Sequence, residues 1–474
     1  MKFINRKSEL RFLDGHFKSG KAELIVIYGR RRIGKTELLL QFAKEKPHIY
    51  FLTSETSEKE NLQELFNRLH EFFKDEITIE KTWDNLFKYL ANKKRFILII
   101  DEFPYLIAQN KAIPSLFQKG WDLYLKDSKI FLVLAGSSMG MMEEYTLLYK
   151  SPLYGRRTGQ WKVEPLKFSE LFNFFQHYSL ENLIGVYGAL DSIPAYIVKF
   201  NPQSDFWENV KQNHLAKGSF LYDETDFLLK QELREPKIYK NILKAIALGN
   251  TKFSEIMNST GMDKSKLFVY LDILESLGII EKRIPVLDKL KSKKGRYFIK
   301  DNFFKFWFRY ILPNKSSIEE GNVDIVIKKI KSDYNNYLGR FVFESVCKSF
   351  LRSVTDQLPF NPETIGSQWG TYRDKGITKS YEIDIVGINE QTREILFAEC
   401  KWQNKKIGLK ELDELKEKAK LVDWHIDKRE EYFAFFSKSG FKTDIKDKNV
   451  LLFNLKDMER VFKQKLSLKR YSIR

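Results

Sequence analysis

The sequence has 474 residues, of which 43% are hydrophobic and 30% are charged, and its formal net charge is +18. Such a composition can form packed cores and mixes both charge signs, which excludes an intrinsically disordered chain. The excess of lysine and arginine favours polyanionic partners, either nucleic acid or an anionic membrane surface.

The cysteine content and the length of the apolar runs bear on the cellular location of the protein. Cys347 and Cys400 each lie within an apolar pattern, and two such thiols do not make a disulfide framework, so we expect a cytoplasmic protein. The first residues lack the apolar stretch of a signal peptide. The longest apolar runs, 96–100 and 130–135, are too short to span a bilayer, so no membrane insertion is expected.

The first third of the chain alternates short apolar runs with amphipathic helical patterns. The runs predict strands at 23–28, 49–53, 96–100 and 130–135, and the amphipathic stretches predict helices at 35–46, 58–74, 82–92 and 114–127. Alternation of strand and helix is typical of a parallel sheet covered on both faces. We therefore predict an α/β multidomain protein whose first domain is residues 1–165.

Residues 29–36 read Gly-Arg-Arg-Arg-Ile-Gly-Lys-Thr and connect a predicted strand to a predicted helix, as a P-loop requires. The two glycines let successive N–H groups turn toward phosphates, and the helix N-terminus adds unpaired donors. Lys35 is expected to reach the β- and γ-phosphates of ATP, and Thr36 to bind Mg²⁺. The predicted nucleotide-binding residues are Gly29, Arg30, Arg31, Arg32, Ile33, Gly34, Lys35, Thr36 and Glu37.

An acidic pair, Asp101 and Glu102, follows the strand predicted at 96–100. Asp101 is placed to hold Mg²⁺ through water, and Glu102 to polarise the attacking water. Ser137 and Ser138 follow the next predicted strand, and either could sense the γ-phosphate; an ordinary turn with serine caps is the alternative.

Arg156 and Arg157 form a basic pair close to the end of the predicted core. Either arginine could supply a cation for transition-state charge, provided that a neighbouring subunit or a closed lid presents it. This hypothesis implies a homo-oligomer or a closing lid. The alternative is a solvated basic turn.

Several of these segments occur together in one known group of proteins. The opening Phe-Ile-Asn-Arg, the P-loop, Ile-Ile-Asp-Glu-Phe-Pro-Tyr-Leu, Gly-Ser-Ser and Pro-Leu-Tyr-Gly-Arg-Arg-Thr resemble the archaeal-type ATPases of the AAA+/STAND group over residues 1–235. The resemblance implies that Asn5 and Arg6 lie near the adenine. It also implies a helical lid at 166–235 whose proline motif is residues 191–196; related proteins tend to carry two glycines before this motif, where this chain has Gly188 and Ala189.

Residues 236–315 have the pattern of a winged helix. Helices are predicted at 238–247 and 253–259, and Asp263 can cap a third helix whose leucines share one face. Segments 279–284 and 296–299 can pair as the wing. We expect Lys264 and Lys266 to contact DNA at the start of the recognition helix, and the basic segment 289–296 to contact phosphates. The alternative is a packing module between two domains.

The remaining residues, 322–474, follow a predicted linker at 313–321 and contain a second group of chemically active side chains. A hairpin is predicted at 381–402, with helices at 334–354 and 408–421 and late strands at 432–436 and 450–453. Because side chains alternate across a strand, Glu399 and Lys401 share one face, which Asp384 can reach from the neighbouring strand and Glu344 from a helix. Carboxylates can hold Mg²⁺ or Mn²⁺, and a lysine can orient water.

This arrangement resembles the PD-(D/E)XK nuclease superfamily, with Asp384, Glu399 and Lys401 at the positions of its Asp…Glu-x-Lys core, although Ile383 stands where the superfamily has proline. The resemblance implies a nuclease-like domain with catalytic Glu399 and Lys401 and a metal held by Glu344, Asp384 and Glu399. The alternative is two amphipathic strands with solvated charges.

Three classes of function remain open from the sequence. The first is an ATP-driven, DNA-directed enzyme with a C-terminal domain that binds or cleaves DNA. The second is a nucleotide-dependent signalling switch of the STAND type, and the third is an ATP-responsive winged-helix transcriptional regulator.

Overall fold

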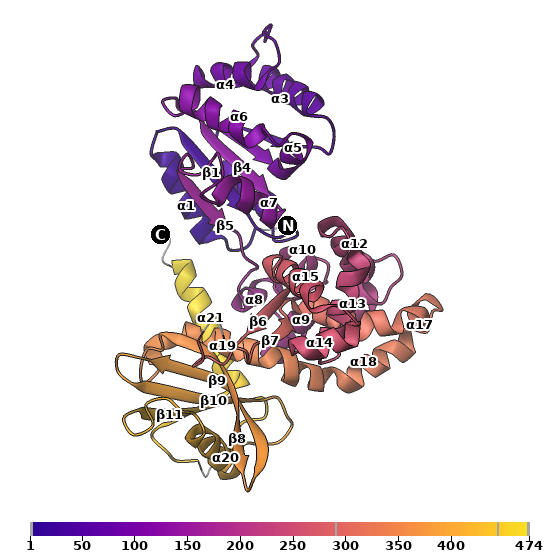
Figure 1. Ribbon diagram of the computed structural model, residues 1–474, viewed down its shortest axis with the longest axis vertical. Helices are drawn as coiled ribbons and strands as arrows, with labels where there is room; N and C mark the ends of the chain where they lie inside the picture. Colours follow the sequence, from indigo (N-terminus) through magenta and orange to yellow (C-terminus); the bar gives the residue numbers. More distant parts are fainter. Residues whose placement is uncertain (1–2, 290–291, 443–444, 472–474) are drawn as a thin grey trace. The chain divides into compact units, whose positions relative to one another are not determined.

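The computed structural model describes residues 3–289, 292–442 and 445–471, with side chains described as far as residue 467 (Figure 1). The chain divides into two compact units: one contains residues up to Leu166 together with Ile193–Ala195, and the other contains Lys167–Ser192 and Tyr196–Arg474. Part of the basic segment predicted at 289–296, residues 290 and 291, lies outside the described residues. Within the described chain, every helix is too short or too polar to cross a membrane.

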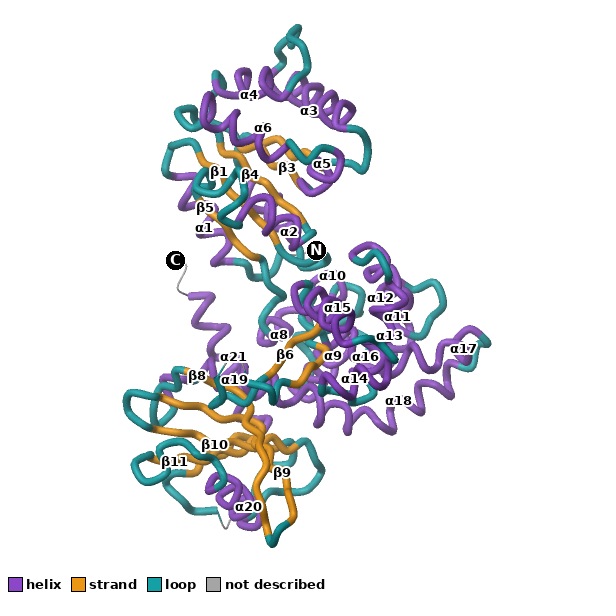
Figure 2. The backbone as a smooth tube through the Cα atoms, viewed as in Figure 1, coloured by secondary structure: helices purple, strands orange, loops and turns teal. Residues whose placement is uncertain are grey.

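The first unit contains a five-stranded parallel sheet in the order β2-β3-β4-β1-β5 (Figure 2). The strands are β1 Glu23–Tyr28, β2 His48–Leu52, β3 Ile97–Asp101, β4 Phe131–Gly136 and β5 Gly159–Lys162. The predicted α/β class and the first four strands are confirmed. The sequence did not indicate β5, because four residues with alternating burial carry too little apolar pattern to mark an edge strand.

Helices cover both faces of this sheet. Leu13 of α1 (Lys7–Lys18) and Phe42 of α2 (Lys35–Ala43) pack with the side chains of β1, β3 and β4 that point to one face. The opposite face is covered by α3 Glu58–Phe73, α4 Trp83–Ala91, α5 Phe103–Gln109 and α6 Ile113–Gly120. The shorter helical segments are η1 Trp121–Leu125, α7 Met139–Met142 and η2 Glu143–Leu147. Burial on both faces explains why β1, β3 and β4 read as unbroken apolar runs.

The second unit begins with a helical region and a winged helix. The helical region contains η3 Phe168–Glu170, α8 Leu171–Phe174, α9 Leu180–Leu190, α11 Phe206–His214 and α12 Phe220–Glu232. Helix α10, Pro194–Ile197, begins in the first unit, which contains Pro194 and Ala195, and ends in the second. The winged helix contains α13 Pro236–Ala247, α14 Phe253–Thr260, α15 Lys264–Ser276, β6 Ile280–Arg283 and β7 Arg296–Ile299. The two strands pair antiparallel, as predicted for the wing. Asp263 precedes α15 as expected, but its side chain makes no capping hydrogen bond.

The linker predicted at 313–321 is wrong. The segment is helical, and the elements around it are α16 Asn302–Phe306, η4 Trp307–Ile311, η5 Leu312–Asn314, α17 Lys315–Glu319, α18 Val323–Tyr337 and η6 Leu338–Val342. Ile318 is buried, and Lys315 forms ion pairs with Asp223 and Asp226 of α12. Proline and polar residues suggested a loop, but proline fits the first turn of a helix, and tertiary contacts decide the rest.

The C-terminal part contains a five-stranded mixed sheet in the order β12-β11-β10-β9-β8. Strands β8 to β10 pair antiparallel, whereas β10, β11 and β12 pair parallel. The elements are α19 Phe343–Ser353, η7 Thr355–Gln357, β8 Thr364–Asp374, β9 Ile377–Asn389, β10 Glu394–Lys401, α20 Leu409–Lys420, β11 Glu430–Ser437, β12 Val450–Asn454 and α21 Leu455–Tyr471.

The two faces of this sheet pack against different helices. Leu412 and Leu415 of α20 join a core with Phe397 and Phe433 on one face. On the other face, Phe350 of α19 contacts the rings of Phe436, Phe453 and Phe462, the last from α21. The predicted hairpin β9–β10 is confirmed and lies in the middle of the sheet.

Candidate functional site

The P-loop has the backbone geometry that close approach to a phosphate requires. Gly29 has φ +150°, and a Cβ there would lie 2.4 Å from the carbonyl oxygen of Val163. Gly34 has φ +85° and directly precedes α2. Neither position tolerates a side chain without strain, so both glycines are needed for the shape of the loop.

Lys35 is folded inside the loop. Its Nζ donates to the carbonyl oxygens of Gly29 at 2.9 Å and Arg30 at 3.2 Å, and the residue is 6% exposed. Arg6 supports the loop from outside, because its guanidinium donates to the carbonyls of Ile33 and Glu164, each at 2.7 Å. Asn5 and Arg6 both have positive φ, so the chain turns sharply where it meets the loop.

The hydroxyl of Thr36 donates to Asp101 Oδ2 at 2.7 Å, and the hydroxyl of Tyr50 donates to the same oxygen at 2.9 Å. Asp101 is 2% exposed at the end of β3. Burial and the Asp101 carboxylate raise the pKa of Tyr50. A hydroxyl and a carboxylate at this distance are hard oxygen donors that fit Mg²⁺. Tyr50 was not predicted, although parallel strands β2 and β3 end at the same edge of the sheet.

Glu102 is held by Ser137, one of the two serines that were candidates for sensing the phosphate. Its Oε2 accepts hydrogen bonds from the Ser137 amide at 3.1 Å and the Ser137 hydroxyl at 2.8 Å. Glu102 has φ +53°, and its carbonyl accepts from the hydroxyl of Thr53 at 2.5 Å. A left-handed glutamate is uncommon, so its backbone is held in place by neighbouring strands. Ser138 is half-buried beside this contact.

The other predicted nucleotide-binding residues surround the loop. Arg31 donates to the hydroxyl of Tyr105 at 3.3 Å, and Glu37 is exposed on α2. The carbonyl of Arg32 accepts from the amide of Ala195 at 3.3 Å. Ala195 belongs to the predicted proline motif, so part of that motif contacts the P-loop within the first unit.

The predicted arginine pair has protein partners. Arg156 forms an ion pair with Asp122 at 3.1 Å. Arg157 donates to the carbonyl of Thr146 at 3.0 Å and lies over the ring of Tyr154. Neither contact reaches the loop residues, so the arginines do not complete the site in this arrangement of the described residues.

A groove lies between the start of α15 and the wing. It has a volume of about 740 Å³, and its lining includes Lys264, Lys282 and Lys293 together with Phe268, whose exposed fraction is 60%. Lys266 is exposed on the same helix. Lysines beside an exposed aromatic ring suit a nucleic-acid backbone and bases.

The C-terminal sheet brings the four predicted side chains into electrostatic contact. Asp384 Oδ2 accepts from the amide of Cys400 at 2.7 Å, across the β9–β10 pair. Burial and then the charge of Glu399 raise the pKa of Asp384 to about 7; Glu344 raises it further and Lys401 lowers it. The four groups therefore share one region of the domain.

Glu399 is bridged by two ammonium groups. Lys401 Nζ donates to its Oε2 at 2.6 Å, and Lys418 Nζ donates to its Oε1 at 2.7 Å. Glu399 is 4% exposed, so both ion pairs are partly shielded from water. Burial would lower the pKa of Lys401, but the charge of Glu399 raises it above its ordinary value. The contact of Lys418 with Glu399 was not predicted, because the sequence does not indicate which strand α20 packs against.

Glu344 is also neutralised by basic side chains. Its Oε1 accepts from Lys348 at 2.5 Å and from the Ser367 hydroxyl at 2.9 Å. Burial would raise the pKa of this carboxyl, but the charges of Lys348 and Arg283 hold it below its ordinary value. Among the residues that the structure describes, no three histidine, cysteine or acidic side chains are close enough to hold one metal ion. Glu344, Asp384 and Glu399 therefore lie in the same region, but they are not close enough together to coordinate one metal ion in this structure.

Comparison with known proteins places this chain among archaeal relatives. An uncharacterized protein of Methanocaldococcus jannaschii is 42% identical over 467 residues, which cover 96% of this chain and 99% of that protein. The chain belongs to the same family. A second uncharacterized protein of that organism is 39% identical over 90 residues, which cover 17% of this chain and 84% of the relative.

Family models describe separate parts of this family member. Residues 3–200 match the ATPase domain predominantly from Archaea, so the chain carries an archaeal-type ATPase domain. Residues 240–282 match the bacterial regulatory proteins of the arsR family, which confirms the helix-turn-helix. Residues 307–417 match archaeal and bacterial proteins of unknown function. That match assigns no activity to the C-terminal sheet.

Among solved structures, the Walker-type ATPase of Pyrococcus abyssi is similar with a TM-score of 0.51 and 23% identity, covering 65% of this chain and 96% of that chain. At this identity the likeness supports the fold alone.

Proposed function

We propose that this protein binds and hydrolyses Mg-ATP at the P-loop and uses the nucleotide cycle to act on DNA. In this proposal residues 1–165 are the ATPase core, 166–235 the lid, 236–315 the DNA-binding winged helix and 322–474 a nuclease-like domain. The observation that supports it most directly is the contact between Thr36 and Asp101, with Glu102 held beside them by Ser137.

The residues of the loop have separate roles. Backbone N–H groups and Lys35 hold the β- and γ-phosphates, since the loop is shaped by Gly29 and Gly34. When bound, Mg²⁺ neutralises developing charge on the phosphates, and Thr36 and Asp101 are the residues that would hold it. Glu102 accepts a hydrogen bond from the attacking water. Ser137 positions the Glu102 carboxylate in place of sensing the phosphate itself.

Substitution of Glu102 by glutamine tests the assignment of the water-polarising group. The glutamine keeps the size of the side chain and can still accept from Ser137, but it is a far weaker base. We expect Glu102→Gln to bind ATP with the affinity of the parent and to hydrolyse it at least about 100-fold more slowly. Equal rates in parent and variant would show that another group polarises the water.

DNA binding is supported by the groove beside α15. Neutralising Lys264 and Lys266 to glutamine should weaken duplex binding and reduce the salt slope by about one for each phosphate that the protein no longer neutralises. The matched control is the pair Lys237→Gln and Lys244→Gln on α13, which are exposed lysines outside the groove. Binding that falls equally in both pairs would favour the signalling switch over a DNA-directed protein.

A second candidate function, metal-dependent cleavage of DNA, is favoured by the positions of Asp384, Glu399 and Lys401: Lys401 Nζ lies 2.6 Å from Glu399 Oε2, and Asp384 accepts from the amide between these two residues at 2.7 Å. A bound Mg²⁺ or Mn²⁺ would lower the pKa of a coordinated water, and Asp384 and Glu399 are the residues that would hold the ion. Lys401 would then stabilise charge on the phosphate. We expect supercoiled DNA to be nicked by the parent and not by Lys401→Ala. Nicking by both proteins would remove this function, and nicking by neither would favour a regulator or switch.

The same proposal includes self-association, because Arg156 or Arg157 would supply a cation to the nucleotide bound by a neighbouring subunit. One of these side chains would have to leave its partner to reach the nucleotide of another subunit. Mixing Lys35→Ala with Arg157→Ala tests this, because recovery of hydrolysis on mixing requires an arginine supplied in trans.

A further inference from the structure

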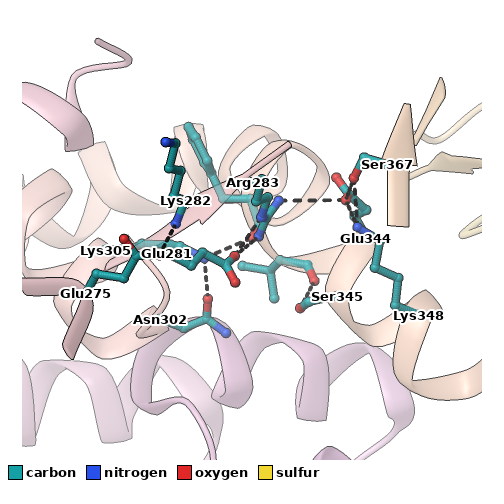
Figure 3. Close-up of polar contacts among 12 residues, drawn as sticks. Glu275, Glu281, Lys282, Arg283, Asn302, Lys305, Glu344, Ser345, Lys348 and Ser367 are labelled. Carbon is teal, nitrogen blue, oxygen red and sulfur yellow. Dashed lines mark hydrogen bonds and ion pairs between the residues drawn. The ribbon is translucent and has the colours of Figure 1, made fainter. Parts of the chain in front are cut away.

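A cavity lies between the wing and the C-terminal sheet, entirely within the second unit. Its volume is about 270 Å³, just below the range of roughly 300–1,000 Å³ for small-molecule sites. The lining comes from α13, from the wing strands β6 and β7, from α16, η4, α18, η6 and α19, and from β8 and β9. Figure 3 shows several of these side chains, with Arg283 between Glu281 and Glu344 and with Lys305 beside Asn302.

The lining is strongly basic. Two carboxylates face six cations, which are Arg283, Arg296, Lys305, Arg309, Arg340 and Lys348. Four of the cations have acidic partners: Arg283 and Lys348 contact Glu344, Arg296 contacts Glu382 and Arg309 contacts Asp333.

Two cations of the lining, Lys305 and Arg340, form no ion pair with an acidic side chain within the described residues. Lys305 Nζ donates to Asn302 Oδ1 at 2.9 Å and to the carbonyl of Phe341 at 3.3 Å. Burial and then the charge of Arg283 lower the pKa of Lys305 to about 8, although the charges of Glu281, Asp191 and Asp301 raise it. An anion in the cavity would stabilise the charged form of Lys305 against burial.

Aromatic rings hold the arginines of the lining in fixed orientations. The guanidinium of Arg340 lies 5.2 Å from the ring centre of Phe341, Arg283 lies 4.6 Å from Phe298, and Arg296 lies 4.9 Å from Trp369. A guanidinium stacked on a ring directs its N–H groups to the edge, where their planar fork matches an oxyanion. The N–H groups of Arg283 and Arg296 already meet Glu281 and Glu382, whereas Arg340 forms no ion pair within the described residues. The half-buried rings of Phe298 and Phe341 also line the cavity, and a planar base can pack against them.

We propose that this cavity binds a phosphate ester of mononucleotide size, with Arg340 and Lys305 as the main contacts to the phosphate. Two cations that form no ion pair within the described residues match a phosphate monoester, which carries up to two negative charges, better than a single carboxylate. The adjoining aromatic lining suits the base. The ligand is either a free nucleotide or the terminal nucleotide of a nucleic-acid strand, since both present this chemistry.

The test uses the full-length chain with Lys35→Ala, so that the P-loop does not dominate nucleotide binding, and with EDTA, so that cleavage cannot occur. Titration calorimetry with AMP, a 5′-phosphorylated single-stranded oligonucleotide and its 5′-hydroxyl counterpart measures the affinities. Arg340 is exposed at the cavity, so Arg340→Gln removes a charge without removing a buried contact. Its matched control is Arg352→Gln, an exposed arginine of α19 that does not line the cavity.

We expect Arg340→Gln to weaken binding at least about tenfold and Arg352→Gln to leave it within about twofold. Lys305→Met should give a second, independent loss of similar size. Binding of AMP without the oligonucleotides identifies a free nucleotide as the ligand, and a preference for the 5′-phosphorylated strand identifies a strand end. Absence of binding by AMP and by both strands overturns the proposal, as do equal effects of Arg340→Gln and Arg352→Gln.

Discussion

The two carboxylate sites of this chain are held by different kinds of donor. In the ATPase unit, Asp101 and Glu102 accept from the neutral hydroxyls of Thr36, Tyr50 and Ser137. In the C-terminal domain, Glu399 and Glu344 accept from the ammonium groups of lysines.

This difference affects how readily each site can accept a cation. A hydroxyl orients a carboxylate and leaves its negative charge available, whereas a lysine already neutralises it. Under the proposed function, a metal at the second site would have to compete with Lys401 and Lys418. At the first site, no lysine would have to leave the carboxylates before a cation could bind.

The largest expected effect concerns Lys35. Lys35→Ala removes a cation that would contact two phosphates, and each such contact is worth about 1.5–3 kcal/mol. We expect a loss of about 3–6 kcal/mol in Mg-ATP binding, measured by calorimetry. The exposed Lys44, at the end of the same helix, supplies the control variant Lys44→Ala. Parent-like affinity in Lys35→Ala would mean that the loop does not hold the triphosphate.

The second effect is on stability and concerns Asp384. Folding raises its pKa from 3.8 to about 7. Between about pH 4 and pH 7, the carboxyl is therefore protonated in the folded state and ionised in the unfolded state. Stability therefore falls as pH rises from about 4 to 7, and the full cost of the buried charge is present at pH 8. Asp384→Asn should be more stable than the parent by roughly 2–4 kcal/mol at pH 8, and the gain should shrink toward pH 4.

Hydrogen exchange of the β10 amides, in EDTA and at matched pH, measures this difference within the domain. Asp427→Asn, at an exposed position, controls for the substitution itself. A variant that loses stability at pH 8 would show that the Asp384 carboxylate is favourably paired with Lys401 despite its burial.

The third effect tests the competition between lysine and metal. Lys418→Met should raise the affinity for Mn²⁺ roughly tenfold, because one of the two ammonium groups on Glu399 is removed. The measurement is made with Asp101→Asn present, which removes the carboxylate expected to hold metal in the ATPase unit. Lys420→Met on the same helix is the control. Unchanged or weaker Mn²⁺ binding in Lys418→Met would show that the lysines on Glu399 do not compete with a metal ion.

The smallest effect concerns the positioning of Glu102. Ser137→Ala removes one neutral hydroxyl donor and leaves the amide contact, so ATP turnover should fall roughly three- to tenfold at unchanged KM. Ser138→Ala should have little effect. If Ser138→Ala is the more damaging variant, the phosphate-sensing alternative for Ser138 is favoured.

Much of the ATPase unit could be predicted because its chemistry lies in contiguous segments. The loop and the serine directly follow buried strands, the acidic pair begins at the last residue of β3, and the carboxyl ends of parallel strands meet at one edge of the sheet. Tyr50 was not predicted, because nothing in the local sequence of its strand indicates that its hydroxyl donates to Asp101. The linker at 313–321 was predicted from local composition alone, and burial of Ile318 overrode that composition.

The sequence by itself determined the α/β class, the P-loop and its frame, the winged helix and the hairpin that carries Asp384 and Glu399. Periodicity and local backbone chemistry carry that information. Only the tertiary structure decided that Lys418 and Lys401 share Glu399, that Ser137 holds Glu102, and that six cations line one cavity. Apart from the pair Lys401 and Glu399 on β10, these contacts join different elements of the chain, and sequence spacing gives no measure of the distance between such elements.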